Sequence, residues 1–237
     1  MNRGKITQTP NKLKEGIVLT YVMGDIHGRF DKYLKLLRDI KFKNSDDLYV
    51  VGDMIDIGDK PCEVIMDMSM RTNVFPILGE HEYIALKVLE KMKKSRKYDE
   101  TLMDKWIEMG GRTTIDGLSK LDEYDREALV DYLKELPLYE EIEVCDKKYI
   151  LVHAGINGKE SEMSSYTPDD LVFEKAELNK CYFKDKYLIT GHRPFEINGK
   201  KQDKIIKYNG HISLNCGEDN DSPLCAIRLE DGCEYYA

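Results

Sequence analysis

The sequence lacks the features of several protein classes. Its six cysteines include no C-x-x-C pair, so we expect no disulfide framework in a chain of 237 residues and predict reduced thiols in the cytoplasm. No apolar run is long enough to cross a bilayer, and the polar start MNRGKITQTPNKLKEG has no signal-peptide core. With a net charge of −8, the chain also lacks the basic balance of a general nucleic-acid or anionic-membrane binder.

Hydrophobic residues make up 41% of the chain, which is enough for an ordinary packed core. Up to residue 94, strand-like segments alternate with amphipathic helical ones, a pattern typical of a layered α/β domain. Residues 95–136 read as a helical insertion, with the turn GGRTTIDG (110–117) between two helices, and strands then return. We therefore predict an α/β fold of two packed sheets with helices outside. Residues 1–15 are expected to be loosely ordered and 16–237 to form a single domain.

Polar side chains recur where the predicted strands end, and ligands of open α/β sheets gather at the carboxyl ends of strands. The turns read GDIHG, GDMID, GEHE, HAG and GHRP, and they contain four of the five histidines. Each residue alone has an ordinary interpretation as a helix cap or a hydrogen-bonded loop residue. Together they indicate a site for Zn²⁺, Mn²⁺ or Fe, which accept mixed carboxylate and imidazole ligands. The fifth histidine, His211, is expected to be structural.

The ordered motifs GD-x-HG, GD-x-x-D-x-G, G-x-HE, HAG and GH-x-P resemble those of calcineurin-like metallophosphoesterases, closest to the bacterial and phage-type serine/threonine phosphoprotein phosphatases. The resemblance runs from about Ile17 to the C-terminus. It implies two mixed sheets in a sandwich flanked by helices, and a site for two divalent metal ions.

The resemblance also implies a role for each motif residue. Asp25 and His27 would bind the first metal, Asp53 would bridge both, and Glu80, His153 and His192 would bind the second. His81, oriented by Asp56, would be the general acid. The ions would lower the pKa of bound water, and the resulting hydroxide would attack phosphorus in line.

The sequence departs from the family pattern in three places, the last of which covers two residues. Glu80 replaces an asparagine that can both bind metal and donate to phosphate, and Ile57 replaces an arginine that grips phosphate. These two changes make the site two charge units more negative. Phe173 and Lys175 stand where the family has tryptophan-x-arginine, which loses a planar guanidinium. Arg193 and Arg112 could partly compensate, and together with Lys175 they are the candidate phosphate-binding residues.

Three functions follow. The first is a two-metal phosphomonoesterase of the serine/threonine protein phosphatase type. The second is a phosphodiesterase or dinucleoside-polyphosphate hydrolase. The phosphates of such substrates carry less charge than a phosphomonoester, so binding them would depend less on the missing arginine. The third is a metal-binding relative with weak or no catalysis and a binding role. The partner would be a phosphorylated protein, nucleotide or small molecule, while the metal identity and oligomeric state stay open.

Overall fold

A computed structural model describes residues 18–95, 100–158, 162–197, 199–217 and 219–237 of the chain. The predicted loose segment 1–15 lies outside these residues. Within the described ranges, no helix combines the length and apolarity needed to cross a membrane.

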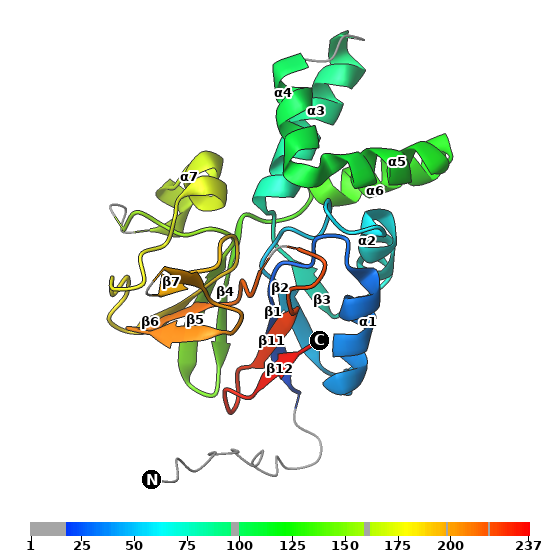
Figure 1. Ribbon diagram of the computed structural model, residues 1–237. Helices are drawn as coiled ribbons and strands as arrows, with labels where there is room; N and C mark the ends of the chain where they lie inside the picture. Colours follow the sequence, from blue (N-terminus) through cyan, green and yellow to red (C-terminus); the bar gives the residue numbers. More distant parts are fainter. Residues whose placement is uncertain (1–17, 96–99, 159–161, 198, 218) are drawn as a thin grey trace.

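The first five-stranded sheet is built mainly from the N-terminal third of the chain (Figure 1). Its order is β12-β11-β1-β2-β3, in which β1, β2 and β3 are parallel and the other two strands are antiparallel additions. Helices α1, α2 and α3 follow β1, β2 and β3, as the alternation predicted. The bounds are β1 Thr20–Met23, α1 Phe30–Asp39, β2 Asp47–Val50, α2 Pro61–Ser69, β3 Val74–Pro76, α3 Glu80–Ser95, β11 Cys225–Arg228 and β12 Glu234–Tyr236.

The second five-stranded sheet has the order β4-β5-β6-β10-β9. Strands β5, β6 and β10 are parallel, whereas β4 and β9 pair antiparallel at the edges. The bounds are β4 Tyr139–Val144, β5 Lys147–Val152, β6 Lys186–Thr190, β9 Ile206–Tyr208 and β10 His211–Ser213. Between β5 and β6 lie a short 3₁₀ turn at Met163–Ser165 and helix α7 (Pro168–Phe173), and a small hairpin joins β7 (Glu196–Ile197) to β8 (Lys200–Lys201).

The two sheets pack against each other through apolar side chains. Because successive strand residues face opposite sides, Val22 points into the layer between the sheets, while Tyr21 and Met23 point to the helices. Val22 shares one buried cluster with Leu151 and Ile189 of the second sheet. The prediction of two mixed sheets flanked by helices is confirmed by this arrangement.

Three helices follow α3 in the predicted insertion: α4 (Glu100–Trp106), α5 (Arg112–Lys120) and α6 (Glu123–Lys134), with a π-helical turn at Ile107–Gly111. The expectation of a turn over 110–117 is wrong for most of that stretch. Gly110 breaks the helix at φ 96°, but α5 starts at Arg112 and packs against α2. Leu118 of α5 is buried in the same core cluster as Ile65 of α2, so packing overrides the turn composition.

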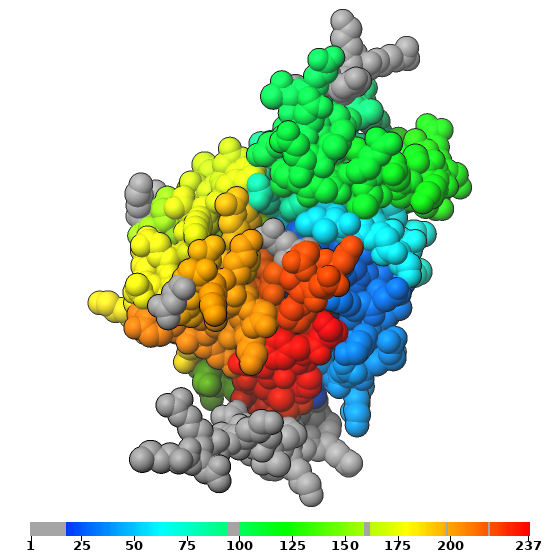
Figure 2. Space-filling model, in the orientation of Figure 1, coloured from blue at the N-terminus to red at the C-terminus, as the bar shows by residue number. Residues whose placement is uncertain are grey.

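The insertion covers one end of the molecule. Figure 2 shows its green helices above the place where the blue and cyan N-terminal elements adjoin the yellow and orange C-terminal ones. It packs on α2 and α3 and places Trp106, Leu129 and Leu133 in the core. The carboxyl ends of the parallel strands of both sheets lie at this end of the molecule.

Candidate active site

The predicted site residues follow parallel strands of both sheets and lie together. Asp25 and His27 follow β1, Asp53 and Asp56 follow β2, and Glu80 and His81 begin α3 just after β3. From the second sheet, His153 follows β5 directly and His192 follows β6. Both sheets thus contribute their carboxyl ends to one cluster of buried polar side chains.

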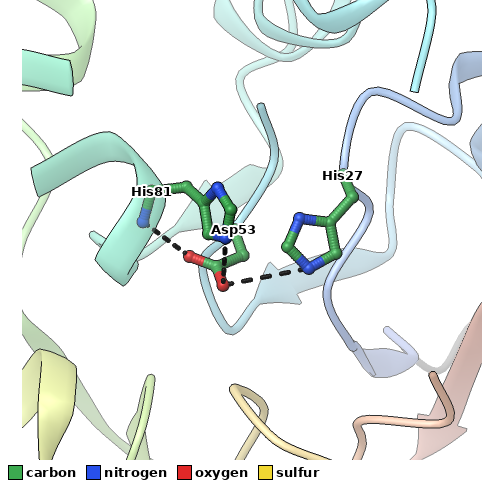
Figure 3. Close-up of side chains that lie close together, drawn as sticks. All are labelled: His27, Asp53 and His81. Atoms are coloured by element: carbon green, nitrogen blue, oxygen red, sulfur yellow. Dashed lines mark hydrogen bonds and ion pairs between the residues drawn. The ribbon is translucent and has the colours of Figure 1, made fainter. Parts of the chain in front are cut away.

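Asp53 occupies the centre of this cluster. Its Oδ2 lies 3.3 Å from Nε2 of His153 and 3.9 Å from Nε2 of both His27 and His81. Figure 3 shows His27 and His81 on either side of the carboxylate, and the backbone N–H of His81 donates to Asp53 Oδ1 at 3.0 Å. One buried carboxylate is therefore surrounded by three imidazoles.

Two groups of these side chains could each hold a metal ion: His27, Asp53 and His81, and Asp53, His153 and His192. Within each group the candidate ligand atoms lie within 4.8 Å of one another. Because both groups contain Asp53, one carboxylate could serve two ions, as dinuclear sites require.

Unpartnered nitrogens support a metal in this cluster. Both ring nitrogens of His27, and Nε2 of His153, are buried and lack a hydrogen-bond partner among the described residues. Buried polar atoms are nearly always partnered in folded proteins. Nitrogens facing a carboxylate without a bond of their own fit the ligand set of a divalent metal.

Protonation of the histidines follows from burial and from Asp53. Burial lowers the pKa of His27 to about 3, and burial together with the charge of His153 lowers the pKa of His192 to about 3. Both are then neutral imidazoles, the form that binds metal. Burial also opposes protonation of His153, but the nearby Asp53 charge outweighs it and raises the pKa to about 9.

Backbone conformation at these turns is unusual. His27, Asp53 and His192 have φ values of 48°, 50° and 68°, in the left-handed region that residues other than glycine rarely adopt. Gly191 precedes His192, and a Cβ at that position would collide with the Asp25 carboxylate. The turns bring side chains from different strands together at a cost in backbone strain, as functional sites often do.

Asp25 and Glu80 lie beside these two groups but belong to neither. Asp25 is buried, and its Oδ2 accepts a hydrogen bond from Asn215 Nδ2 at 2.8 Å. Glu80 Oε2 lies 3.5 Å from His192 Nδ1, and burial together with the charge of Asp53 raises the pKa of Glu80. The ligand roles that the resemblance implies for Asp25 and Glu80 stay predictions.

His81 has a different environment from the other histidines. Its Nδ1 lies 2.7 Å from Asp56 Oδ2 in a buried pair. Burial opposes protonation, but the Asp53 charge and the bond to Asp56 outweigh it and raise the pKa of His81 to about 10. What separates His81 from the other histidines is its bond to a buried carboxylate: with Nδ1 held by Asp56 and Nε2 facing the cluster, the ring is placed to donate a proton there.

A cavity of about 740 Å³ opens beside the cluster. Two of the three predicted phosphate-binding cations, Lys175 and Arg193, line it together with Ile57, whereas Arg112 does not. On α5, Arg112 pairs instead with Asp116 one helical turn away, at 3.2 Å, and its side chain is 70% exposed. The residues around the cavity are Asp53, Ile57, Glu80, His81, Glu108, Met109, Gly110, Lys175, His192, Arg193, Pro194, Glu196 and Lys201.

Three residues at the site were not assigned a role from the sequence. The buried carboxylate of Glu82 accepts from the backbone N–H groups of residues 53, 54, 55 and 79, at 2.8–3.0 Å. Asn215 Nδ2 donates to Asp25 and to the carbonyl of His192, and Lys201 is a third cation at the cavity. Glu82 completes the GEHE motif and Asn215 follows the strand beginning at His211, so both stood at strand-end turns; nothing local marked Lys201.

His211 lies outside this site. It is buried on β10, where its Nε2 is 2.9 Å from Thr190 Oγ1, and burial lowers its pKa to about 4. Its ring packs edge-on against Tyr182 and Phe195. These contacts support the structural role expected for it.

The chain is similar to proteins of known families. The family model for calcineurin-like phosphoesterases matches residues 19–226. The symmetrical bis(5'-nucleosyl)-tetraphosphatase of Wigglesworthia glossinidia brevipalpis is 30% identical over 211 residues, which are 88% of this chain and 64% of that protein. The protein of the same name from Buchnera aphidicola subsp. Baizongia pistaciae is 32% identical over 139 residues, 58% of this chain and 44% of that protein. The chain thus spans less than two thirds of either relative.

Solved structures share the fold at lower identity. A crystal structure of a proposed diadenosine tetraphosphatase has a TM-score of 0.67 and 18% identity, with 95% of each chain covered. A serine/threonine phosphatase from Saccharomyces cerevisiae has a TM-score of 0.60 and 15% identity, covering 90% of this chain and 72% of that one. At these identities the likeness shows a common architecture.

Proposed function

Since the chain belongs to the calcineurin-like phosphoesterase family, we propose that it is a two-metal phosphohydrolase with dinucleoside polyphosphates as its substrate class, cleaving the phosphoanhydride bond between two phosphates. The observation that carries the hydrolase is the buried Asp53 carboxylate, which two separate groups of histidines share. The substrate class is supported by the names of the relatives and by the cavity.

Each ligand position has a proposed role. Asp25, His27 and Asp53 would hold one divalent ion, and Asp53, Glu80, His153 and His192 would hold the other. Ions bound there would supply a nucleophile at neutral pH and positive charge for the transferring oxygens. Mn²⁺, Fe and Zn²⁺ all accept such carboxylate and imidazole ligands.

Side chains of the protein would donate the proton and hold the turns of the site in place. His81 would hold a proton at Nε2 and give it to the leaving oxygen, while Asp56 keeps the ring oriented through Nδ1. Glu82 would keep the Asp53 turn in place through its backbone bonds.

The cavity supports a polyphosphate substrate better than an isolated phosphomonoester. It extends from the cluster around Asp53 to three cations, Lys175, Arg193 and Lys201, which could contact successive phosphates of a chain. Its volume of about 740 Å³ is that of a pocket for a substantial organic ligand. Ile57 lines the wall where the family pattern has a phosphate-gripping arginine, and internal phosphates carry less charge than a terminal monoester.

A phosphomonoesterase is the second candidate. The sequence motifs put this activity first, but the tetraphosphatase relatives favour the dinucleoside-polyphosphate alternative instead. A non-catalytic relative is disfavoured, because metal binding alone does not require His81 to be paired with the buried Asp56 carboxylate.

We expect Mn²⁺-loaded protein to hydrolyse diadenosine tetraphosphate with a higher kcat/KM than p-nitrophenyl phosphate or bis(p-nitrophenyl) phosphate. Separation of the nucleotide products by ion-exchange chromatography measures the rate, and symmetrical cleavage would give ADP alone. Faster turnover of p-nitrophenyl phosphate would favour the monoesterase. Two bound ions without turnover of any of these substrates would contradict the hydrolase.

Exchange of Glu80 for asparagine should raise kcat/KM for p-nitrophenyl phosphate about tenfold, because it removes a negative charge beside His192 and restores an N–H donor for phosphate. Initial rates at fixed Mn²⁺ measure the effect, with metal content determined in parallel. Glu108→Gln neutralises a second carboxylate at the same cavity, outside the ligand groups, and should change the rate less. An unchanged or lower rate for Glu80→Asn would contradict the charge argument.

A further inference from the structure

The carboxylate of Asp56 is held by side chains from the helical insertion. It is fully buried and lies within hydrogen-bond distance of three donors. Besides His81, these are Trp106 Nε1, at 3.0 and 3.2 Å from its two oxygens, and Thr114 Oγ1, at 2.5 Å from Oδ1. Both insertion residues are themselves buried, at 0% and 3% exposed.

Thr114 makes two bonds to the same residue. Its hydroxyl donates to Asp56 Oδ1 and accepts from the backbone N–H of Asp56 at 3.0 Å. A hydroxyl can donate and accept through its single oxygen atom in this way, which a methyl group cannot. The backbone and the carboxylate of Asp56 are thereby fixed relative to each other.

The insertion also holds the next residue. The backbone N–H of Ile57 donates to the carbonyl of Gly110 at 3.2 Å. Asp56 and Ile57 both have positive φ, of 69° and 60°. This conformation is strained for Ile57, because its side chain is β-branched. Gly110, at φ 96°, has no room for a Cβ because Ile57 lies against it. The insertion therefore stabilises a turn that the local sequence disfavours.

We propose that Trp106 and Thr114 are positioning residues for the reaction. By fixing both oxygens of Asp56 they orient the ring of His81, so that its Nε2 faces the Asp53 cluster. The helical insertion then completes the acid pair of the active site, besides lining the cavity. This inference rests on the proposed hydrolase, in which His81 protonates the leaving group.

The test compares substrates that differ in their need for an acid. Phenyl phosphate has a more basic leaving group than p-nitrophenyl phosphate, so its hydrolysis depends more on proton donation. In the Mn²⁺-loaded protein, Thr114→Val should lower kcat for phenyl phosphate about tenfold and affect p-nitrophenyl phosphate much less. Thr114→Ser retains the hydroxyl and should restore the wild-type ratio. Trp106→Phe removes the indole donor together with part of the ring, so it should lower the phenyl phosphate rate in the same way as Thr114→Val and cost some stability in addition.

A neighbouring threonine provides the matched control. Thr113 Oγ1 donates to the Gly110 carbonyl, which also accepts from Ile57, and no bond joins it to the Asp56 carboxylate, so Thr113→Val makes the same change while leaving both oxygens of Asp56 bonded. Its ratio of rates should equal that of the wild type. Equal losses on both substrates for Thr114→Val, or a ratio that serine does not restore, would overturn the positioning role.

A second readout uses the metal-free protein and separates this inference from the proposed function. In NMR spectra, the Nδ1 proton of His81 should be protected from solvent exchange in the wild type and in Thr114→Ser. It should exchange faster in Thr114→Val and Trp106→Phe. If the wild type hydrolyses neither diadenosine tetraphosphate nor the phosphoesters, the hydrolase is refuted, while the proton signal still decides whether the insertion orients His81. Equal protection in all four proteins would refute the inference.

Discussion

Asp53→Asn should lower kcat for diadenosine tetraphosphate at least about 10³-fold and reduce the bound metal from two ions to one or none. Both candidate ligand groups contain this carboxylate, and a neutral amide cannot offset the charge of two divalent ions. Metal ions contribute several kcal/mol to the stabilisation of a transition state, and each 1.4 kcal/mol is about tenfold in rate. Metal content by plasma mass spectrometry and initial rates are the two measurements.

The fold should survive this exchange. The asparagine carbonyl can still accept the hydrogen bond from the backbone N–H of His81, which Asp53 Oδ1 accepts at 3.0 Å. Asp59→Asn makes the same change in an exposed residue of the same loop and should retain both metals and full activity. Retention of two ions by Asp53→Asn would show that Asp53 does not bridge them.

Glu82→Ala should have the largest effect on stability, a loss of about 4 kcal/mol or more in the free energy of unfolding. The Glu82 carboxylate accepts from four backbone N–H groups of the turns after β2 and β3. Each buried donor left without a partner costs about 1–3 kcal/mol, partly relieved where water enters. Urea unfolding of the metal-free protein, followed by circular dichroism, measures the loss without a contribution from metal binding.

The same truncation at an exposed position provides the comparison. Glu143 on β4 is solvent-exposed, and Glu143→Ala should change the free energy of unfolding by no more than about 0.5 kcal/mol. A similarly small loss for Glu82→Ala would mean that the turns carrying Asp53 and Gly79 are held by other contacts.

Local patterns predicted much of the fold and the site. The alternation of strands and helices up to residue 95 appears in the structure as β1 to α3, because the residue spacing itself distinguishes a buried strand from an amphipathic helix. The motif residues were predicted to meet because parallel strands end at a common edge. Their placement agrees with this, although their roles as ligands and acid stay predictions, as do the single domain and its boundaries.

Other features depended on packing that no local pattern encodes. The glycines at 110 and 111 favoured a turn, yet α5 begins immediately after them because Leu118 packs into the core with α2. Arg112 was a candidate for phosphate binding on charge alone. Its position on α5 instead directs it to solvent and to Asp116, since a helix fixes the face on which each side chain lies.

By itself, the sequence determined the strand-and-helix order, the family and the set of chemically competent side chains, because each is recorded in residue spacing or in short motifs. Only the tertiary structure decided how that chemistry is held in place. Asp56 finds Trp106 and Thr114 at separations of 50 and 58 residues, and Asp25 finds Asn215 at 190. Such partners are set by how helices and sheets pack on one another, and a side chain's own neighbours in sequence carry no record of that packing.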